Sequence, residues 1–259
     1  ACSGSVLALA PIAKQDGNLI VTAYAGSSEI RKTGDEVIRF IPDAVSVAEA
    51  MAEFASTLPI SSKIGLLYEE QDYAKSAALT LQDRLGSRIV ATEAYLANDT
   101  SFRTQITKLK GANIDVLLYI PTSDKAEKII FQQMQTLAYN PHIIGDVNVC
   151  GYPINPKDFG ISRTTCFNAE FVNETDAYKQ FLASYKNRYG SDSSAPFYNA
   201  ITYDIIYLTD AFARKNRKDD FIPSLKKYFL SGVVGKMSTY SFTPGGEVLA
   251  DQYLKIVEK

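Results

Sequence analysis

Along most of this chain, short apolar runs rich in β-branched residues alternate with segments whose apolar residues recur at helical spacing. This alternation predicts an α/β fold of repeated strand–helix units, with mostly parallel sheets and helices on both faces. The predicted strands are residues 19–24, 63–68, 88–94, 116–120, 142–146 and 165–172. The predicted helices begin at Asp43, at Asp72 and at residue 99 or 100, and others cover residues 123–137, 178–189 and 197–212.

The last part of the chain changes character. Residues 237–242 and 252–257 are short apolar–polar alternations, and Thr243-Pro244-Gly245-Gly246 stands between them. Because proline and glycine favour a tight turn, this pattern predicts a β-hairpin rather than another parallel unit.

Composition limits the classes of protein that the chain can belong to. With 259 residues, 46% of them hydrophobic and 22% charged, the chain can bury one or two cores, and two domains are expected. The net charge is −2 and the basic residues are dispersed, which argues against a nucleic-acid partner. No apolar run approaches the roughly 18 residues that a membrane span needs. Turn-rich stretches at residues 58–62, 191–196 and 231–236 are the expected crossings between the domains.

The sequence lacks the side-chain sets of common enzymes. Its one histidine, His142, follows Pro141 in an apolar run, so histidine-based triads and multi-histidine metal sites have few parts. Neither a Gly-x-Ser-x-Gly nor a phosphate-binding Gly-x-x-x-x-Gly-Lys motif occurs. The adjacent acids Glu69-Glu70 and Asp219-Asp220 are expected to be solvated. We therefore expect a binding protein without a metal or other cofactor.

The chain contains three cysteines. Cys150 and Cys166 lie close enough in sequence to bridge a loop in an oxidising compartment, or else they stand as two separate buried thiols. Cys2 follows a small residue near the start of the sequence, where it would carry the lipid if the protein is a membrane-anchored bacterial lipoprotein.

Three segments place hydroxyl or aromatic residues where a strand gives way to a helix. They are residues 2–5, 22–29 and 68–73. In an open α/β sheet, ligands bind at the carboxyl ends of the strands, where helix N-termini present free N–H groups to anions. These segments predict a site for a small polar ligand. The alternative is that Ser3 and Ser5 cap a helix and that residues 25–28 form an ordinary turn.

Short motifs also follow one another in a fixed order over nearly the whole chain. They are Cys-Ser-Gly-Ser at 2–5, Gly-Asp-Glu-Val-Ile-Arg-Phe-Ile-Pro at 34–42, Leu-Tyr-Glu-Glu-Gln-Asp-Tyr at 67–73, Ser-Phe-Arg-Thr-Gln-Ile-Thr-Lys-Leu-Lys at 101–110 and Tyr-Lys-Asn-Arg-Tyr-Gly at 185–190. This order resembles the type I periplasmic binding proteins of the leucine/isoleucine/valine-binding family.

The resemblance implies a two-lobed fold whose hinge closes on one solute, an amino acid or a related small polar molecule, for delivery to an ABC permease. The expected first lobe is residues 1–60 with 194–233, and the second is residues 61–193 with 234–259. The expected location is the periplasm or another extracytoplasmic space. The alternative function is a ligand-sensing domain of a receptor or regulator with the same fold.

In the first lobe, the resemblance assigns roles to four residues. Ser3 matches a serine that contacts the ligand's carboxylate, and Ala25 matches a residue whose backbone carbonyl contacts the ligand. Gly26 falls where relatives usually carry a threonine hydroxyl, which the neighbouring Ser27 would replace.

Further roles follow for residues elsewhere in the chain. Tyr73 and Tyr198 match aromatic residues of the site, and Thr122 falls where many relatives carry an aromatic side chain. Relatives that bind α-amino acids usually have an acidic residue at the position of Val147, and Asp146 stands one residue early. Either Asp146 moves into place to pair with the ligand's ammonium group, or it caps a helix and the ligand is not an ordinary amino acid.

Relatives carry roughly two more strand–helix units, about 70 residues, before the segment that matches this chain. The first lobe is therefore expected to be incomplete, with an open sheet edge. Three explanations stay open: a sequence that has lost its start, a homodimer whose second copy covers the edge, or a genuinely short variant.

Overall fold

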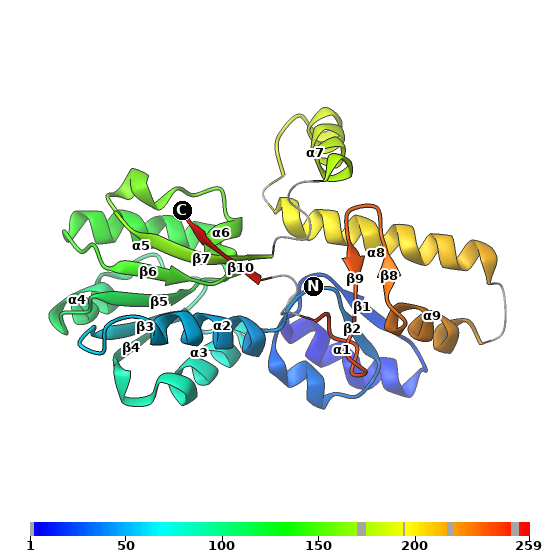
Figure 1. The fold of residues 1–259 in the computed structure, drawn as a ribbon, viewed down its shortest axis with the longest axis horizontal. Helices are drawn as coiled ribbons and strands as arrows, with labels where there is room; N and C mark the ends of the chain where they lie inside the picture. The colour runs from blue at the N-terminus through cyan, green and yellow to red at the C-terminus, as the bar shows by residue number, and fades with distance from the viewer. Residues whose placement is uncertain (1–2, 170–174, 194, 217–219, 250–253) are drawn as a thin grey trace. The chain divides into compact units, whose positions relative to one another are not determined.

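The computed structural model describes residues 3–169, 175–193, 195–216, 220–249 and 254–259 (Figure 1). The chain divides into two compact units. The first is Ala1–Asp43 with Ala169–Tyr253, and the second is Ala44–Asn168 with Leu254–Lys259. These boundaries differ from the predicted crossings at residues 58–62, 191–196 and 231–236. Residues 58–62 form a turn within the second unit, and residues 231–236 lie within the first unit and include the buried Val233.

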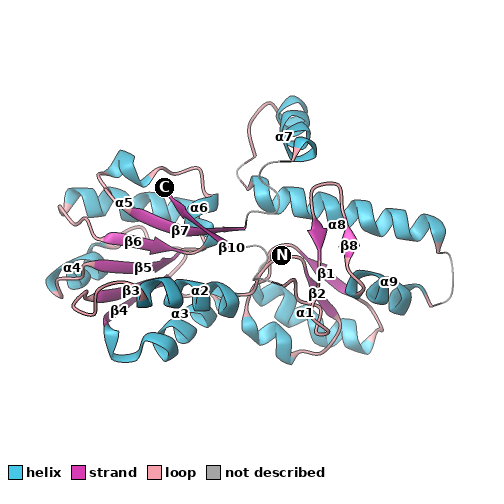
Figure 2. Cartoon of the chain, viewed as in Figure 1, coloured by secondary structure: helices cyan, strands magenta, loops and turns pink. Residues whose placement is uncertain are grey.

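The second unit is built on a six-stranded sheet with the strand order β10-β7-β6-β5-β3-β4 (Figure 2). Its strands are β3 (Ile64–Glu69), β4 (Ile89–Tyr95), β5 (Val116–Ile120), β6 (His142–Gly145), β7 (Thr164–Ala169) and β10 (Leu254–Glu258). From β4 to β7 each neighbouring pair is parallel. All five residues of β5 are buried, as expected for a central strand with both faces covered.

Two layers of helices cover this sheet. The helices of the unit are α2 (Ala44–Ser56), α3 (Asp72–Leu85), α4 (Arg103–Gly111), α5 (Asp124–Thr136) and the short α6 (Val147–Gly151), with 3₁₀ turns η2 (Gly86–Arg88) and η3 (Pro156–Phe159). Because side chains alternate along a strand, Leu66 and Leu118 pack in the core beneath α2 and α3. Leu67 and Leu117 pack in the opposite core, with α4 and α5. The predicted mixed α/β architecture is confirmed.

The first unit contains shorter strands. Its elements are α1 (Ser3–Gln15), β1 (Ile20–Thr22), η1 (Ser28–Lys32), β2 (Val37–Arg39), α7 (Asp176–Tyr189), α8 (Pro196–Lys215), α9 (Phe221–Leu230), β8 (Val233–Val234) and β9 (Thr239–Tyr240). β1 and β2 are parallel, and β8 and β9 are antiparallel. The ring of Phe40 lies at the centre of the core, 4.8–5.3 Å from the rings of Phe229, Tyr240 and Phe242. Within the described ranges, no helix is both long and apolar enough to cross a membrane.

The predicted C-terminal hairpin is wrong in its pairing. The turn at residues 243–246 connects two segments of the first unit. These segments pair with each other, since Leu249 N–H donates to Ser241 C=O at 2.9 Å. β10 instead lies beside β7 in the sheet of the second unit. Local alternation predicted the strand but not its partner β7, which is some 90 residues away in sequence. A hydrogen bond links the two strands, in which Thr165 Oγ1 donates to Glu258 Oε1 at 2.6 Å. Residues 170–172, predicted as strand, lie outside the described residues.

A buried carboxylate in the middle of α8 holds the β8–β9 hairpin. Asp204, which is 0% exposed, accepts hydrogen bonds from the N–H groups of Lys236 at 2.7 Å and Met237 at 3.0 Å, and from Tyr240 Oη at 2.9 Å. A Cβ atom on Gly235 would collide with this carboxylate. The hairpin therefore approaches α8 closely only because position 235 is glycine.

We predict that Asp204→Ala lowers the free energy of unfolding by about 3 kcal/mol or more, because several buried N–H groups lose their acceptor. Urea denaturation followed by circular dichroism measures this change. Asp210→Ala is the control, since Asp210 lies on the same helix but pairs with Arg214 at the surface. Equal effects of the two substitutions would contradict a structural role for Asp204.

Candidate functional site

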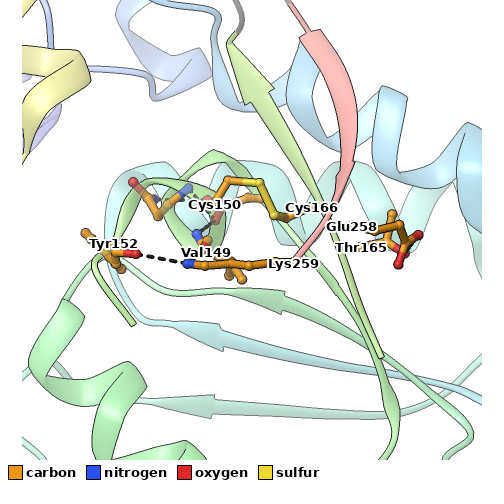
Figure 3. Close-up of a disulfide and its surroundings, with 9 residues drawn as sticks. Val149, Cys150, Tyr152, Thr165, Cys166, Glu258 and Lys259 are labelled. Carbon is orange, nitrogen blue, oxygen red and sulfur yellow. Dashed lines mark hydrogen bonds between the residues drawn. A yellow bond between two sulfur atoms is a disulfide. The ribbon is translucent and has the colours of Figure 1, made fainter. Parts of the chain in front are cut away.

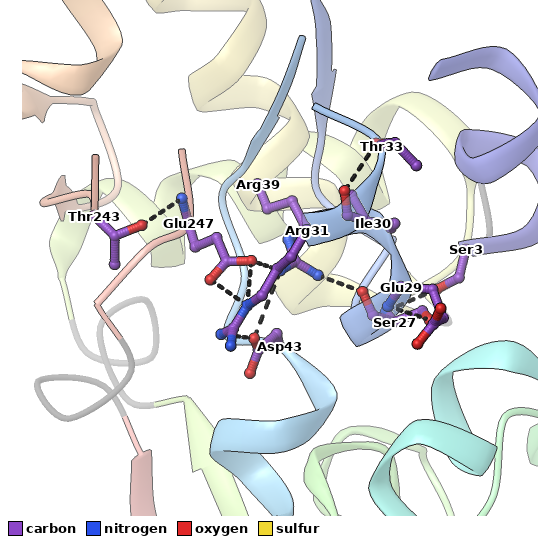
Figure 4. Close-up of polar contacts among 10 residues, drawn as sticks. All are labelled: Ser3, Ser27, Glu29, Ile30, Arg31, Thr33, Arg39, Asp43, Thr243 and Glu247. Atoms are coloured by element: carbon purple, nitrogen blue, oxygen red, sulfur yellow. Dashed lines mark hydrogen bonds and ion pairs between the residues drawn. The ribbon is translucent and has the colours of Figure 1, made fainter. Parts of the chain in front are cut away.

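The N-terminus of α1 meets the turn that follows β1. Ser3, the first residue of α1, accepts a hydrogen bond on Oγ from the N–H of Ser27 at 3.1 Å, across 24 residues of sequence. Ala25 N–H donates to Thr22 Oγ1 at 3.3 Å. The structure thus brings Ser3 together with Ser27, the last residue of the predicted turn of Ala25, Gly26 and Ser27 (Figure 4). We call this group the α1 turn site.

Ser27 has a further structural role. Its hydroxyl accepts the N–H of Glu29 at 3.3 Å and caps the 3₁₀ turn η1. Its carbonyl accepts a hydrogen bond from Arg39 Nη1 at 2.8 Å. The turn is therefore held from both sides, by the start of α1 and by the last residue of β2.

Three charged residues surround Arg39, which is 1% exposed, and form a cluster of four with it (Figure 4). Arg39 pairs with Glu247 and, at 3.6 Å, with Asp43. Arg31 pairs with Asp43 and, at 2.6 Å, with Glu247. Burial, followed by the charge of Arg31, lowers the pKa of Arg39 to about 9, which leaves it protonated at neutral pH. We call these four residues the arginine cluster.

Sequence reasoning missed the arginine cluster. Its signal was a charged residue, Arg39, inside the apolar run Val37-Ile38-Arg39-Phe40-Ile41. A buried charge of this kind needs a partner. Asp43 lies only four residues after Arg39, but Glu247 lies 208 residues away and cannot be found from sequence spacing. Asp43 is the last residue of the first segment of its unit, and Glu247 forms an isolated bridge with Arg39. The cluster therefore joins the candidate turn to Glu247, which lies 208 residues after Arg39 in the sequence.

We predict that Arg39→Met lowers the free energy of unfolding by about 3–5 kcal/mol, because it removes a cation that two buried or half-buried acids share. Thermal and urea denaturation measure the loss. Arg84→Met is the control, since Arg84 pairs with Glu49 at the surface, with a side chain that is 57% exposed, and its removal changes stability much less. A loss no larger than that of Arg84→Met would contradict the importance of the cluster.

In the second unit, predicted site residues stand at the carboxyl ends of the sheet strands. Tyr73, the second residue of α3, is half-buried. Thr122 follows β5, and its N–H donates to Oε2 of Glu69 at the end of β3, at 3.1 Å. Asp146 follows β6. The parallel strands thus place these residues along one edge of the sheet.

Asp146 caps α6, as one of the two alternatives predicted. Its Oδ1 accepts the N–H groups of Asn148 at 3.0 Å and Val149 at 3.4 Å, and its Oδ2 accepts Asn148 Nδ2 at 3.0 Å. The carboxylate is 0% exposed. Burial raises its pKa to about 7, although hydrogen bonds from Asn148, Val149 and Tyr73 oppose the change. Val147, at the position where relatives carry an acid, is half-buried and packs against the core beneath α2 and α3.

We predict that Asp146 makes stability depend on pH. A carboxyl group whose pKa rises from 3.8 to about 7 on folding carries no penalty below pH 4 and the full penalty above pH 7. The free energy of unfolding therefore falls as pH rises through this window, by at most about 4 kcal/mol. Asp146→Asn lacks this fall, whereas Asp83→Asn, a change at an exposed acid of the same unit, retains it. Urea denaturation between pH 4 and 8 tests the difference.

The other end of α6 is also held (Figure 3). A disulfide joins Cys150 to Cys166, with their Cα atoms 5.7 Å apart, so one of the two predicted alternatives for these cysteines is confirmed. Lys259 Nζ donates to the carbonyls of Val149 at 2.7 Å and Tyr152 at 2.9 Å. α6 is therefore fixed by its cap at one end, and by a covalent bond and a lysine at the other.

Tyr198, in the first turn of α8, stacks on Tyr24, which directly precedes the α1 turn site. Their ring centroids are 4.6 Å apart and the ring planes differ by 23°. Tyr24 Oη donates to Asn199 Oδ1 at 3.0 Å. Tyr24 was not singled out from the sequence, although it stands within the polar segment of residues 22–29. Across the described residues, no group of three or more histidine, cysteine, aspartate or glutamate side chains could hold a metal ion.

Sequence comparison gives matches of one kind. The family model of the periplasmic binding proteins matches residues 1–240. A Leu/Ile/Val-binding protein homologue of Brucella abortus is 26% identical over 147 residues, which cover 51% of this chain and 36% of that protein. The Leu/Ile/Val/Thr-binding protein of Salmonella typhimurium is 25% identical over 122 residues, 46% of this chain and 33% of that protein. The matches thus span about one third of the length of these curated relatives.

Solved structures agree on the fold. The branched-chain amino acid binding protein LivJ of Streptococcus pneumoniae, in complex with isoleucine, has a TM-score of 0.77 at 19% identity, covering 100% of this chain and 78% of that one. A solute binding protein of Rhodopseudomonas palustris, in complex with 3,4-dihydroxybenzoic acid, has a TM-score of 0.79 at 16% identity, covering 100% and 76%. The predicted type I periplasmic binding protein fold is confirmed.

Proposed function

The chain belongs to the periplasmic binding protein family, and we propose that it is the extracytoplasmic component of an ABC transporter that binds a small carboxylate solute. The family consists of binding proteins, not enzymes. The observation that carries the proposal is the α1 turn site, in which Ser3 and Ser27 meet at the start of a 13-residue helix.

This arrangement suits a carboxylate for a physical reason. The first N–H groups of a helix have no partner within the helix, and its N-terminal end carries a partial positive charge. Hydroxyl groups and turn N–H groups beside such an end supply further donors to an anion. Ser3 would therefore meet the solute's carboxylate, as the resemblance implies. The turn of Ala25, Gly26 and Ser27 would complete the contacts, with the carbonyl of Ala25 accepting a hydrogen bond from a donor group of the solute and the hydroxyl of Ser27 replacing the threonine of relatives.

The remaining site residues would hold the rest of the solute. Tyr73 and Thr122 would contribute from the second unit, and Tyr198 from the first. Closure of the two units on the solute is the mechanism that the family resemblance implies, and the closed form would be the one presented to the permease. A direct contact between Asp146 and the solute stays a prediction. The oxygens of Asp146 already accept hydrogen bonds from Asn148 and Val149 in α6.

The solute class follows from what the relatives share. LivJ is bound to isoleucine, and the Rhodopseudomonas palustris protein is bound to 3,4-dihydroxybenzoic acid. These two solutes differ in shape and in the presence of an ammonium group, and both carry a carboxylate. The carboxylate is therefore the part of the solute that the proposal specifies.

The disulfide supports a location outside the cytoplasm. Bonds such as Cys150–Cys166 form and persist in oxidising compartments such as the bacterial periplasm. We therefore propose a periplasmic or other extracytoplasmic location, with lipid attachment at Cys2 as a further proposal.

We predict that a carboxylate solute at 100 times its dissociation constant stabilises the protein by about 2.7 kcal/mol and raises its melting temperature by roughly 5–10 °C. Differential scanning fluorimetry with millimolar amino acids, aromatic acids and their amides measures the shift. The double variant Ser3→Ala with Tyr73→Ala should lose it.

The control is Ser231→Ala with Tyr189→Ala, which changes the same two residue types at exposed positions. This variant should keep the full temperature shift. A shift that survives unchanged in the Ser3 and Tyr73 double variant would refute the proposed site, and the absence of any shift for the wild-type protein would refute the proposed function.

A further inference from the structure

The arginine cluster lies where the chain leaves the first unit. The first segment of that unit ends at Asp43, and α2 of the second unit begins at the next residue, Ala44. The chain returns to the first unit at Ala169 and leaves it again after Tyr253. Glu247 belongs to the last segment of the first unit, which leads to this final crossing. The two acids of the cluster therefore stand on the segments that lead to two of the three crossings.

The same two segments are joined through their backbones. The N–H of Arg39 donates to the carbonyl of Gly246 at 2.7 Å, and its carbonyl accepts the N–H of Val248 at 3.1 Å. Gly246 has a φ of +79°, and a Cβ atom at this position would lie 2.7 Å from the carbonyl oxygen of Val37. The close approach of the two segments therefore requires a glycine at position 246.

Side chains of opposite charge link these segments a second time (Figure 4). Arg31 and Arg39 each pair with both acids, Asp43 and Glu247. The side chain of Asp43 is 0% exposed, and that of Glu247 is 13% exposed. A planar guanidinium carries several donors and can hold two carboxylates at once. The two arginines therefore connect the segment before the first crossing to the segment before the last one.

Arg31 is the member of the cluster that can be replaced without opening the core. Its side chain is 45% exposed, whereas that of Arg39 is 1% exposed. The next residue of the same 3₁₀ turn is Lys32, whose side chain is 72% exposed and pairs with Glu29 at 2.7 Å. Two neighbouring cations of η1 thus differ in one respect, because Arg31 reaches the crossing segments and Lys32 pairs within its own turn.

We propose that the arginine cluster fastens the hinge between the two units. A hinge works through a few residues at the ends of elements, which absorb the change in backbone angles. Asp43, directly before α2, is such a residue, and the cluster ties it to Glu247. This restraint narrows the range of arrangements that the two units adopt in the absence of solute. The inference goes beyond the proposed function, and its test needs no solute.

Distances between the two units test the restraint. Spin labels are attached to Lys128→Cys on α5 and to Lys227→Cys on α9, which are exposed positions in different units, in a Cys2→Ser background. Double electron–electron resonance then gives the distribution of distances between the labels in solute-free protein. Arg31→Met should lower the ratio of the main distance population to the remaining ones about fivefold, because a half-exposed ion pair restrains the hinge by about that factor.

Lys32→Met is the matched control, because it removes the neighbouring cation and leaves the cluster intact. Its distance distribution should equal that of the wild type. Circular dichroism and urea denaturation follow the folding of each variant. An unchanged distribution in folded Arg31→Met would overturn the inference even if the free energy of unfolding falls, since the cluster would then stabilise the first unit without restraining the hinge. Equal changes in the two variants would also contradict it.

Salt gives a second test that leaves the cluster unsubstituted. Raising the ionic strength from about 0.1 M to about 1 M shortens the screening length from about 10 Å to about 3 Å, which weakens the pairs of the half-exposed Arg31. The wild-type distribution should then approach that of Arg31→Met, which itself should not change. If Arg31→Met fails to fold, Arg31→Lys takes its place, with a smaller change in the same direction. Equal widening of the wild type and the variant in salt would assign the effect to other contacts and refute the role of the cluster.

Discussion

Parallel strands all end at the same edge of their sheet, and this constraint places the candidate residues of the second unit. In the second unit it brings Tyr73, Thr122 and Asp146 to one edge from three separate strand–helix connections. In the first unit the turn after β1 meets the start of α1 through the hydrogen bond from Ser27 N–H to Ser3 Oγ. The site residues lie far apart in sequence because each comes from a different connection.

A second interaction holds the first unit's part of this arrangement. Arg39 donates to the carbonyl of Ser27 and pairs with Asp43 and Glu247, so one guanidinium connects the candidate turn to two other chain segments. A planar group with several donors can make these contacts together, which a lysine ammonium could not do with the same geometry. Removing the guanidinium would leave carbonyl and carboxylate oxygens without their donor, which explains why one residue can matter so much here.

Local patterns predicted most of the elements but fewer of their relations. Strand β5 lies at its predicted residues, 116–120, because a fully apolar run of that length suits only a covered strand. β2 and β8, which have three and two residues, were not predicted. The pairing of β10 was wrong because alternation shows that a strand forms and not which strand it joins.

The sequence by itself determined the α/β class, the resemblance to leucine/isoleucine/valine-binding proteins and the position of the polar turns, because periodicity and motif order are local properties. Only the tertiary structure decided where the chain crosses between its units, that Asp146 turns inward as a cap, and which charges surround Arg39. It also decided that Tyr24 meets Asn199, 175 residues away, and that Arg39 meets Glu247, 208 residues away. Such pairs depend on how distant segments pack, and no local pattern carries that information.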